Sequence, residues 1–425
     1  MHSTFYVLDG RLNAERRTSN VERATDYALF PMRRWSIILG ILIIIAAGVI
    51  GYLRRNPQKV AEIKEQTRER LEQATRPAEL LAIVSEPGGQ SRSSEIWLID
   101  PDKSDNRAQA RLAASSSQQK NLAWATDGSQ LAYVIFPEGE TKPGEIHIIN
   151  IDSKSDRVIG RGDYPAWSPD GTRIAYSFQA DFNQFPTGNP KGDGIRIASL
   201  TSEYRGTIIK SRYYEVENKN RIYFEPEWSP DGQFIAFKVG LYWGNISGVL
   251  RVADNKYLAD FPVEEFRWSP DSRRLAGVRT KVWGPEQTAG AFLFDVPSDP
   301  VTEAGADGAG ILEGKALAED ATSIEWSADA AAVYLTKPDQ AKIATGLSKI
   351  AIASGQEEVL VEGLPPDMII IAHSPDRKKL VLGVNPMRRK RNQELNYLIV
   401  DIEKRSSSKL LENFAGRILE VAWRP

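Results

Sequence analysis

Short apolar runs separated by polar turn sequences fill the chain from about residue 80 to its end. The runs at 130–136, 174–178, 234–239, 275–278, 333–335 and 380–384 are almost continuously apolar. A strand with one face in water alternates apolar and polar residues, so continuous runs of this length indicate strands covered on both faces. The pattern therefore predicts small β-sheets that pack against one another face to face.

A repeated phrase precedes most of these runs. Its fullest form is Trp167-Ser168-Pro169-Asp170-Gly171, in which proline, aspartate and glycine are typical of a tight turn between two strands. Further copies begin at Trp124, Trp228, Trp268, Trp326, His373 and Trp423, with spacings of 43, 61, 40, 58, 47 and 50 residues along the seven copies. Spacings near fifty residues are typical of propeller blades.

The two ends of the repeat region complement each other. The strands expected at 81–84 and 95–100 follow no copy of the phrase, whereas the strand at 417–423 ends in a copy that has no successor. Pairing 417–423 beside 81–84 would close the ring and leave no free edge inside it. We therefore predict an all-β fold, a seven-bladed β-propeller over 80–425, with six or eight blades as the alternatives.

The phrase Trp-Ser-Pro-Asp-Gly followed by Ile-Ala two residues later resembles the repeat of TolB-like (WD40-like) propellers. The same repeat occurs in the propellers of prolyl-oligopeptidase-type proteins. The copies at Trp167 and Trp228 match in full, the copy at Trp268 has Ser272 in place of glycine, and those at Trp326 and His373 are degenerate. The resemblance implies a propeller without the hydrolase domain, and it does not specify a ligand.

The N-terminal part of the chain has a different composition. Residues 1–32 are polar and predict a flexible tail, and 33–55 predict a transmembrane helix. The core of this predicted helix, 35–53, is 19 residues without a charge. As a helix it would be about 29 Å long, which matches a hydrocarbon layer of roughly 30 Å. Arginine pairs border this core at 33–34 and 54–55, where they can reach the two membrane surfaces.

Membrane orientation is not decided by charge, because six Lys or Arg precede the core and six follow it closely. We expect a single-pass anchor with a cytoplasmic N-terminus and an extracytoplasmic propeller on a bacterial membrane. The alternatives are a cleaved signal peptide and a secreted propeller, favoured if Met32 is the true start, or a cytoplasmic propeller. Residues 56–79 predict a helical stalk whose few heptads give only weak support for a dimer.

Composition excludes several functional classes. The net charge of −2 argues against nucleic-acid binding, and the chain has no cysteine and three histidines. We therefore expect no cofactor and no metal. The repeated aspartates, such as Asp170, Asp231 and Asp271, are expected to hold turns, and the repeat tryptophans (Trp124, Trp167, Trp228, Trp268, Trp326 and Trp423) to anchor the packing of adjacent blades.

No catalytic motif is evident, since the sequence has neither a nucleophile elbow nor sialidase boxes. Tyrosines are favoured at protein interfaces, so the insertion with Tyr204, Tyr213, Tyr214 and Tyr223 is the candidate partner surface, although its rings would equally suit packing across a blade edge. We expect a membrane-anchored, non-enzymatic propeller that binds a protein or another cell-envelope component. The alternative is a hydrolase or lyase in the axial channel, which would require charged side chains with shifted pKa values to cluster there.

Overall fold

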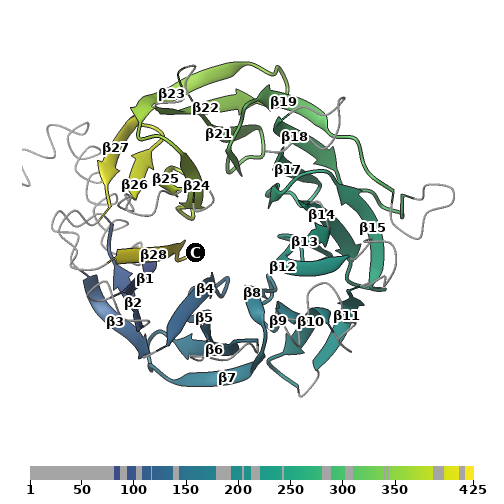
Figure 1. The fold of residues 1–425 in the computed structure, drawn as a ribbon, viewed down its shortest axis with the longest axis vertical. Coiled ribbons are helices and arrows are strands. Elements are labelled where there is room, and N and C mark those ends of the chain that lie inside the picture. The colour runs from purple at the N-terminus through teal and green to yellow at the C-terminus, as the bar shows by residue number, and fades with distance from the viewer. Residues whose placement is uncertain are drawn as a thin grey trace, which may run out of the picture. The chain divides into compact units, whose positions relative to one another are not determined.

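The structure is a computed structural model that describes fifteen segments between residues 81 and 425. These are 81–86, 93–101, 108–115, 117–136, 143–178, 193–202, 205–211, 221–241, 244–279, 289–301, 310–338, 341, 344–385, 397–410 and 417–425. All of them fall in a compact unit that spans Ala78–Pro425. Within them the chain forms strands and turns, and the strands are arranged as a ring of blades around an axis (Figure 1).

The described strands form seven antiparallel sheets of four strands each. Blade 1 joins both ends of the ring and consists of β28 (Arg417–Trp423), β1 (Leu81–Glu86), β2 (Ser94–Ile99) and β3 (Ala108–Ser115). Blades 2 to 4 follow in chain order: β4 (Gln118–Trp124), β5 (Gln130–Phe136), β6 (Glu145–Asn150) and β7 (Asp156–Arg161); β8 (Asp163–Trp167), β9 (Arg173–Phe178), β10 (Gly194–Ser199) and β11 (Arg205–Lys210); β12 (Ile222–Trp228), β13 (Phe234–Leu241), β14 (Gly244–Arg251) and β15 (Lys256–Phe261).

Blades 5 to 7 repeat the same order, with the first strand of each blade on the inside of the ring (Figure 1). They are β16 (Glu265–Trp268), β17 (Arg274–Arg279), β18 (Gly290–Asp295) and β19 (Lys315–Glu319); β20 (Ser323–Trp326), β21 (Ala332–Pro338), β22 (Thr345–Ala351) and β23 (Glu357–Leu364); β24 (Met368–His373), β25 (Lys379–Val384), β26 (Leu398–Asp401) and β27 (Ser406–Lys409). The prediction of an all-β, seven-bladed propeller is confirmed.

The C-terminal strand closes the ring. β28 is the inner strand of blade 1 and pairs antiparallel with β1, with Ile83 opposite Val421 and Leu81 opposite Trp423. Figure 1 shows the last coloured segment of the chain beside the first. The pairing expected between 418–423 and 81–84 is therefore present, and it joins the two ends of the unit through one sheet.

The second strand of each blade is buried on both faces, as its apolar run predicts. In β5, Leu131, Ala132 and Val134 are fully buried and Tyr133 is 1% exposed. One face of β5 packs with blade 1 and the other with blade 3, so each blade supplies half of two interblade cores. Burial of one large apolar side chain stabilises the fold by about 2 kcal/mol.

The repeat turns share one hydrogen-bond pattern. In the turn of blade 3, the amide of Gly171 donates to the carbonyl of Ser168, and Gly171 has φ of +68°. A carboxylate oxygen of Asp170 accepts hydrogen bonds from the Ser168 hydroxyl at 2.5 Å and from the Thr172 amide at 2.9 Å. The same serine–aspartate bond recurs in four other blades, at Asp231, Asp271, Asp329 and Asp376.

The predicted N-terminal segments, namely the tail 1–32, the transmembrane helix 33–55 with its core 35–53 and the stalk 56–79, lie outside the described residues. No helix in the described part of the chain is long and apolar enough to cross a membrane.

Candidate functional site

A ring of tryptophans joins the inner strands of adjacent blades. In five blades the indole N–H of the repeat tryptophan donates to a backbone carbonyl of the preceding blade. The acceptor is always the residue directly before the repeat tryptophan of that blade. The donors and acceptors are Trp124 and Ala422 (3.2 Å), Trp167 and Ala123 (3.0 Å), Trp228 and Ala166 (3.1 Å), Trp268 and Glu227 (3.2 Å), and Trp326 and Arg267 (3.0 Å). These bonds keep the inner strands in register around the axis.

The residue before each repeat tryptophan differs around the ring. It is alanine in blades 1, 2, 3 and 7, whereas Glu227, Arg267 and Glu325 occupy this position in the consecutive blades 4, 5 and 6. All three charged residues and two of the alanines, Ala372 and Ala422, line a cavity of about 610 Å³ near the axis. A cavity of this size suits a small molecule or a short peptide segment.

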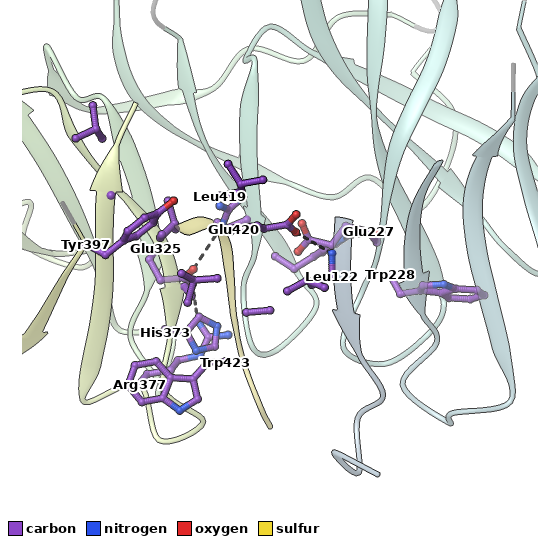
Figure 2. Close-up of a pocket in the computed structure, with 18 of the residues that line it drawn as sticks. Leu122, Glu227, Trp228, Glu325, His373, Arg377, Tyr397, Leu419, Glu420 and Trp423 are labelled. Atoms are coloured by element: carbon purple, nitrogen blue, oxygen red, sulfur yellow. Dashed lines mark hydrogen bonds and ion pairs between the residues drawn. The ribbon is translucent and has the colours of Figure 1, made fainter. Parts of the chain in front are cut away.

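Charged and apolar residues line the cavity together (Figure 2). The charged or ionisable residues are Glu227, Arg267, Glu325, His373 and Arg377 from blades 4 to 7 and Glu420 from blade 1. Apolar residues from blades 1, 2 and 7 lie among them, namely Leu122, Ile371, Leu419, Val421 and the two alanines. A ligand that fills the cavity would therefore meet both charged groups and hydrocarbon.

Glu325 is the most buried acid of the cavity, with only 3% of its surface exposed. Its carboxylate lies 2.7 Å from Nη1 of Arg377 and 3.5 Å from Nε of Arg267, and it also accepts the backbone N–H of Trp326. Burial raises its pKa, but His373, Arg267 and Arg377 outweigh burial and hold the pKa below its usual range. Glu325 is therefore a fixed anion that orients two arginines.

Glu227 lies in the same cavity in a different electrostatic state. Burial raises the pKa of Glu227 to about 7, because the favourable charge of Arg267 is opposed by that of Glu325. No ion pair within 4 Å involves Glu227 among the described residues. Glu227 is thus a carboxyl group that can gain or lose a proton near neutral pH.

A second, smaller hollow of about 240 Å³ shares Leu122, Glu227, Arg267 and Glu420 with the cavity. Here Lys238 lies 2.6 Å from Glu225 and 2.8 Å from Glu265, so one cation serves two acids. Glu420 of β28 accepts the backbone amides of Asn121 and Leu122, each at 2.7 Å, across the boundary between blades 1 and 2. Burial raises the pKa of Glu420 despite these two bonds.

The tryptophan ring is interrupted on both sides of blade 7. His373 replaces its tryptophan, and the His373 ring bonds through Nδ1 to the carbonyl of Ser374 at 2.8 Å. The next tryptophan, Trp423 in blade 1, is 7% exposed, and its buried indole nitrogen has no hydrogen-bond partner among the described residues. Both residues line the cavity, and Figure 2 shows them with Arg377 toward one end of it.

The structure places the predicted site residues as follows. Tyr223 is 1% exposed and packs edge-on against Phe237, so its inclusion in an exposed partner surface was wrong; the apolar neighbours on β12 and β13 bury it. Tyr204, Tyr213 and Tyr214 lie outside the described residues. Asp170, Asp231 and Asp271 bond within their turns, and the repeat tryptophans lie at interblade contacts rather than on the surface.

The charged residues of the cavity were not predicted, although the sequence contains a signal for them. Glu227, Arg267 and Glu325 stand immediately before a repeat tryptophan, where four other copies have alanine. Comparison of the copies column by column would have shown these departures. Arg377 departs in the same way, because it occupies the turn position that is glycine in three other copies.

The chemistry that these groups can perform is limited by their pairing. Arg267 and Arg377 are both directed to Glu325, and no group of three or more His, Cys, Asp or Glu side chains in the described segments is placed to hold a metal ion. Charged groups with shifted pKa values do cluster in the channel, which is the condition we attached to the enzymatic alternative. Glu227 is the group best suited to proton transfer there.

No protein-family model matches the chain. Among solved structures, the chain is similar to a prolyl endopeptidase (13% identity, 81% of this chain and 50% of that chain, TM-score 0.53). It is also similar to an oligogalacturonate lyase solved in complex with manganese (10% identity, 78% of this chain and 84% of that chain, TM-score 0.50) and to TolB from Acinetobacter baumannii (18% identity, 82% of this chain and 67% of that chain, TM-score 0.46). The chain thus spans half the length of the endopeptidase. At these identities, the likeness to the endopeptidase and the lyase shows the fold alone, a β-propeller.

Proposed function

We propose that this protein is a non-enzymatic, membrane-anchored propeller that binds a segment of a partner protein in its axial cavity. The observation that carries the proposal is a cavity that combines apolar residues with Glu325, whose charge is already paired with Arg267 and Arg377. Charges paired in this way position a ligand without having to perform chemistry on it, and the apolar residues provide the area that drives association.

The membrane anchor rests on the uncharged stretch 35–53, with the propeller placed on the extracytoplasmic side of a bacterial membrane. The absence of cysteine from the chain makes this topology simple to test. A single cysteine at the exposed position Ser407 in β27 should react with a membrane-impermeant maleimide in intact cells. Labelling only after the cells are permeabilised would place the propeller in the cytoplasm instead.

A crosslinking experiment tests the binding site. A single cysteine in place of Leu419, which lines the cavity, is coupled to a photoreactive group, and the matched control carries the same group at Val359, which is 47% exposed on β23. We expect a discrete adduct with one partner from position 419 and none from position 359. Equal crosslinking from both positions would show that the cavity has no special role in binding.

One observation favours the enzymatic alternative, a hydrolase or lyase. Glu227, with a pKa of about 7, shares the cavity with Arg267 and His373, which is a suitable set for general acid–base catalysis. The likeness in fold to an endopeptidase and a lyase suggests peptides and oligouronides as the substrates to try. Turnover of either by the purified protein, lost in Glu227→Gln, would establish an enzyme, whereas no turnover by the wild type supports the binding function.

A further inference from the structure

Two carboxyl groups stand at the junction of the cavity and the smaller hollow. The two spaces share Leu122, Glu227, Arg267 and Glu420. Glu227 lies on β12 and Glu420 on β28, and Figure 2 shows their carboxyl groups directed toward the same part of the cavity. Both residues keep part of their surface exposed, so a ligand in the cavity can reach them.

Acids outnumber cations in the lining of these two spaces. The acids are Glu225, Glu227, Glu265, Glu325 and Glu420, and the cations are Lys238, Arg267 and Arg377. Even with His373 protonated, the acids remain in excess by one. The ion pairs join Lys238 to Glu225 and Glu265, and both arginines to Glu325. Glu227 and Glu420 form no ion pair with any described residue, so the uncompensated acid lies with them.

The electrostatic state of the two groups reflects this missing counter-ion. Burial raises the pKa of Glu227 to about 7 and raises that of Glu420 above its usual range. A cation placed beside them would favour the ionised carboxylates and offset the cost of their burial. The charge of the lining therefore complements a positively charged group.

Apolar side chains lie beside the same two carboxyl groups. Leu122 of β4 and Leu419 of β28 line the cavity and are only partly buried by the blades. The donors of an ammonium group radiate from one atom, so it can bridge carboxyl groups on two strands, whereas a guanidinium is matched to both oxygens of one carboxylate. Lysine carries its ammonium group on a hydrocarbon stem that can cover apolar surface.

From this arrangement we propose that Glu227 and Glu420 bind the ammonium group of a lysine of the partner segment, with the lysine stem packed on Leu122 and Leu419. The inference rests on the proposed binding function and deepens it by naming the partner residue that enters the cavity. The excess of acids selects a cation, and the placement of the two carboxyl groups on separate strands selects lysine over arginine.

The test uses the full-length protein in detergent micelles at pH 8, with its tryptophan indoles labelled with ¹⁵N. Trp268 is the reporter, because it lines the cavity and its indole N–H donates to the carbonyl of Glu227 at 3.2 Å. Its resonance is assigned from Trp268→Phe. The ligand is N-acetyllysinamide, and the matched control is N-acetylnorleucinamide, which has the same stem without the ammonium group.

We expect N-acetyllysinamide to shift the Trp268 resonance saturably at constant ionic strength. N-acetylnorleucinamide should bind at least about tenfold more weakly, because it lacks a charge-assisted hydrogen bond. The indole of Trp167, a repeat tryptophan that does not line the cavity, should move little.

Substitution of the carboxyl groups separates their charge from the shape of the cavity. Glu227→Gln keeps the shape and should weaken the binding of N-acetyllysinamide by about tenfold or more. Glu420→Gln retains one oxygen as an acceptor for the amides of blade 2 and should also weaken binding. Glu362→Gln removes the same charge at an exposed position on β23 and should leave the affinity unchanged.

The pH dependence distinguishes a direct ion pair from an effect on shape. Glu227 takes up a proton between pH 8 and pH 6, so the wild type should lose up to about tenfold more affinity over this range than Glu227→Gln. The other groups that act on this position or share its cavity are Arg267, Glu325, His373, Arg377 and Glu420. All of them remain in the variant, so their titration cancels in the comparison.

Three results would overturn the lysine site: no saturable shift, equal binding of N-acetyllysinamide and N-acetylnorleucinamide, or unchanged affinity in Glu227→Gln. Tighter binding of N-acetylargininamide than of N-acetyllysinamide would also overturn it, because the ligand would then be a guanidinium. If partner crosslinking from position 419 persists in any of these cases, the proposed function stands and only this inference fails.

Discussion

Glu227 provides the sharpest prediction about the cavity, because its protonation changes near neutral pH. Burial raises the pKa of Glu227 from 4.5 to about 7. Each pKa unit corresponds to about 1.4 kcal/mol, so the ionised form destabilises the folded state by up to about 3 kcal/mol at pH 8. The side chain keeps some contact with water, which screens the charge, so we expect an effect of about 2 kcal/mol.

The direction of the pH dependence follows from the raised pKa. Between pH 4.5 and pH 7 the folded state holds the Glu227 proton while the unfolded state releases it, so this group lowers stability as the pH rises and has no further effect above pH 7. Glu227→Gln cannot ionise. The variant should therefore match the wild type near pH 4.5 and exceed its unfolding free energy by about 2 kcal/mol at pH 8.

Urea unfolding of the full-length protein in detergent, followed by tryptophan fluorescence at pH 4.5, 6 and 8, measures this difference. Other carboxylates titrate in this range, but they do so in both proteins and cancel in the comparison. Glu362→Gln, at an exposed position on β23, serves as the control and should show no pH-dependent difference. A constant difference between wild type and Glu227→Gln across the three pH values would refute the raised pKa.

Three other substitutions test separate parts of the structure. Asp170→Ala removes the acceptor of the blade 3 turn and should lower the free energy of unfolding by about 1 kcal/mol at pH 7. Hydrogen bonds from Ser168 and Thr172 lower the pKa of Asp170 to about 2. Thermal denaturation should therefore show the stability difference between variant and wild type shrinking as the pH falls from 4 to 2. Ile83→Ala, at a fully buried position opposite Val421 in the closing sheet, should cost about 2–5 kcal/mol in urea unfolding. His373→Trp restores the repeat tryptophan, and by filling part of the cavity it should weaken the crosslinked adduct formed from position 419.

The first two substitutions have a matched control variant. Asp152→Ala changes an exposed aspartate in a different turn and should leave the acid dependence unchanged. Val158→Ala, at a position that is 53% exposed, should cost well under 1 kcal/mol; an Ile83→Ala protein as stable as this control would show that the closing sheet contributes little. An adduct of unchanged yield in His373→Trp would separate the partner site from this part of the cavity.

Local signals explain why the fold was predictable. The turn phrase recurs with its tryptophan, serine and aspartate, and each of these residues acts within a few positions or on the adjacent blade. Asp170 bonds Ser168 and Thr172, and Trp167 bonds Ala123 of the neighbouring blade. Interactions of this kind repeat once per blade, so a pattern visible in the sequence corresponds directly to a contact in the structure.

The cavity could not be derived in the same way. Glu325 is paired with Arg267, 58 residues away, and with Arg377, 52 residues away in the other direction, and no local pattern indicates such pairing. Tyr223 shows the opposite error, because an aromatic residue beside a long insertion suggested a surface whereas the sheet buries it. Whether a side chain faces solvent, a blade core or the axis depends on how seven sheets pack.

The sequence by itself determined the module, its number of copies and the pairing of the last strand with the first, because turn chemistry and continuous apolar strands are properties of short segments. Tertiary structure alone decided which departures from the repeat meet at the axis. Ring closure brings the inner strands of all blades together, so Glu227, Arg267, Glu325, His373 and Arg377 share one cavity although they span 151 residue positions. Their charges then act on one another through a partly dehydrated space, which raises the pKa of Glu227 and lowers that of Glu325.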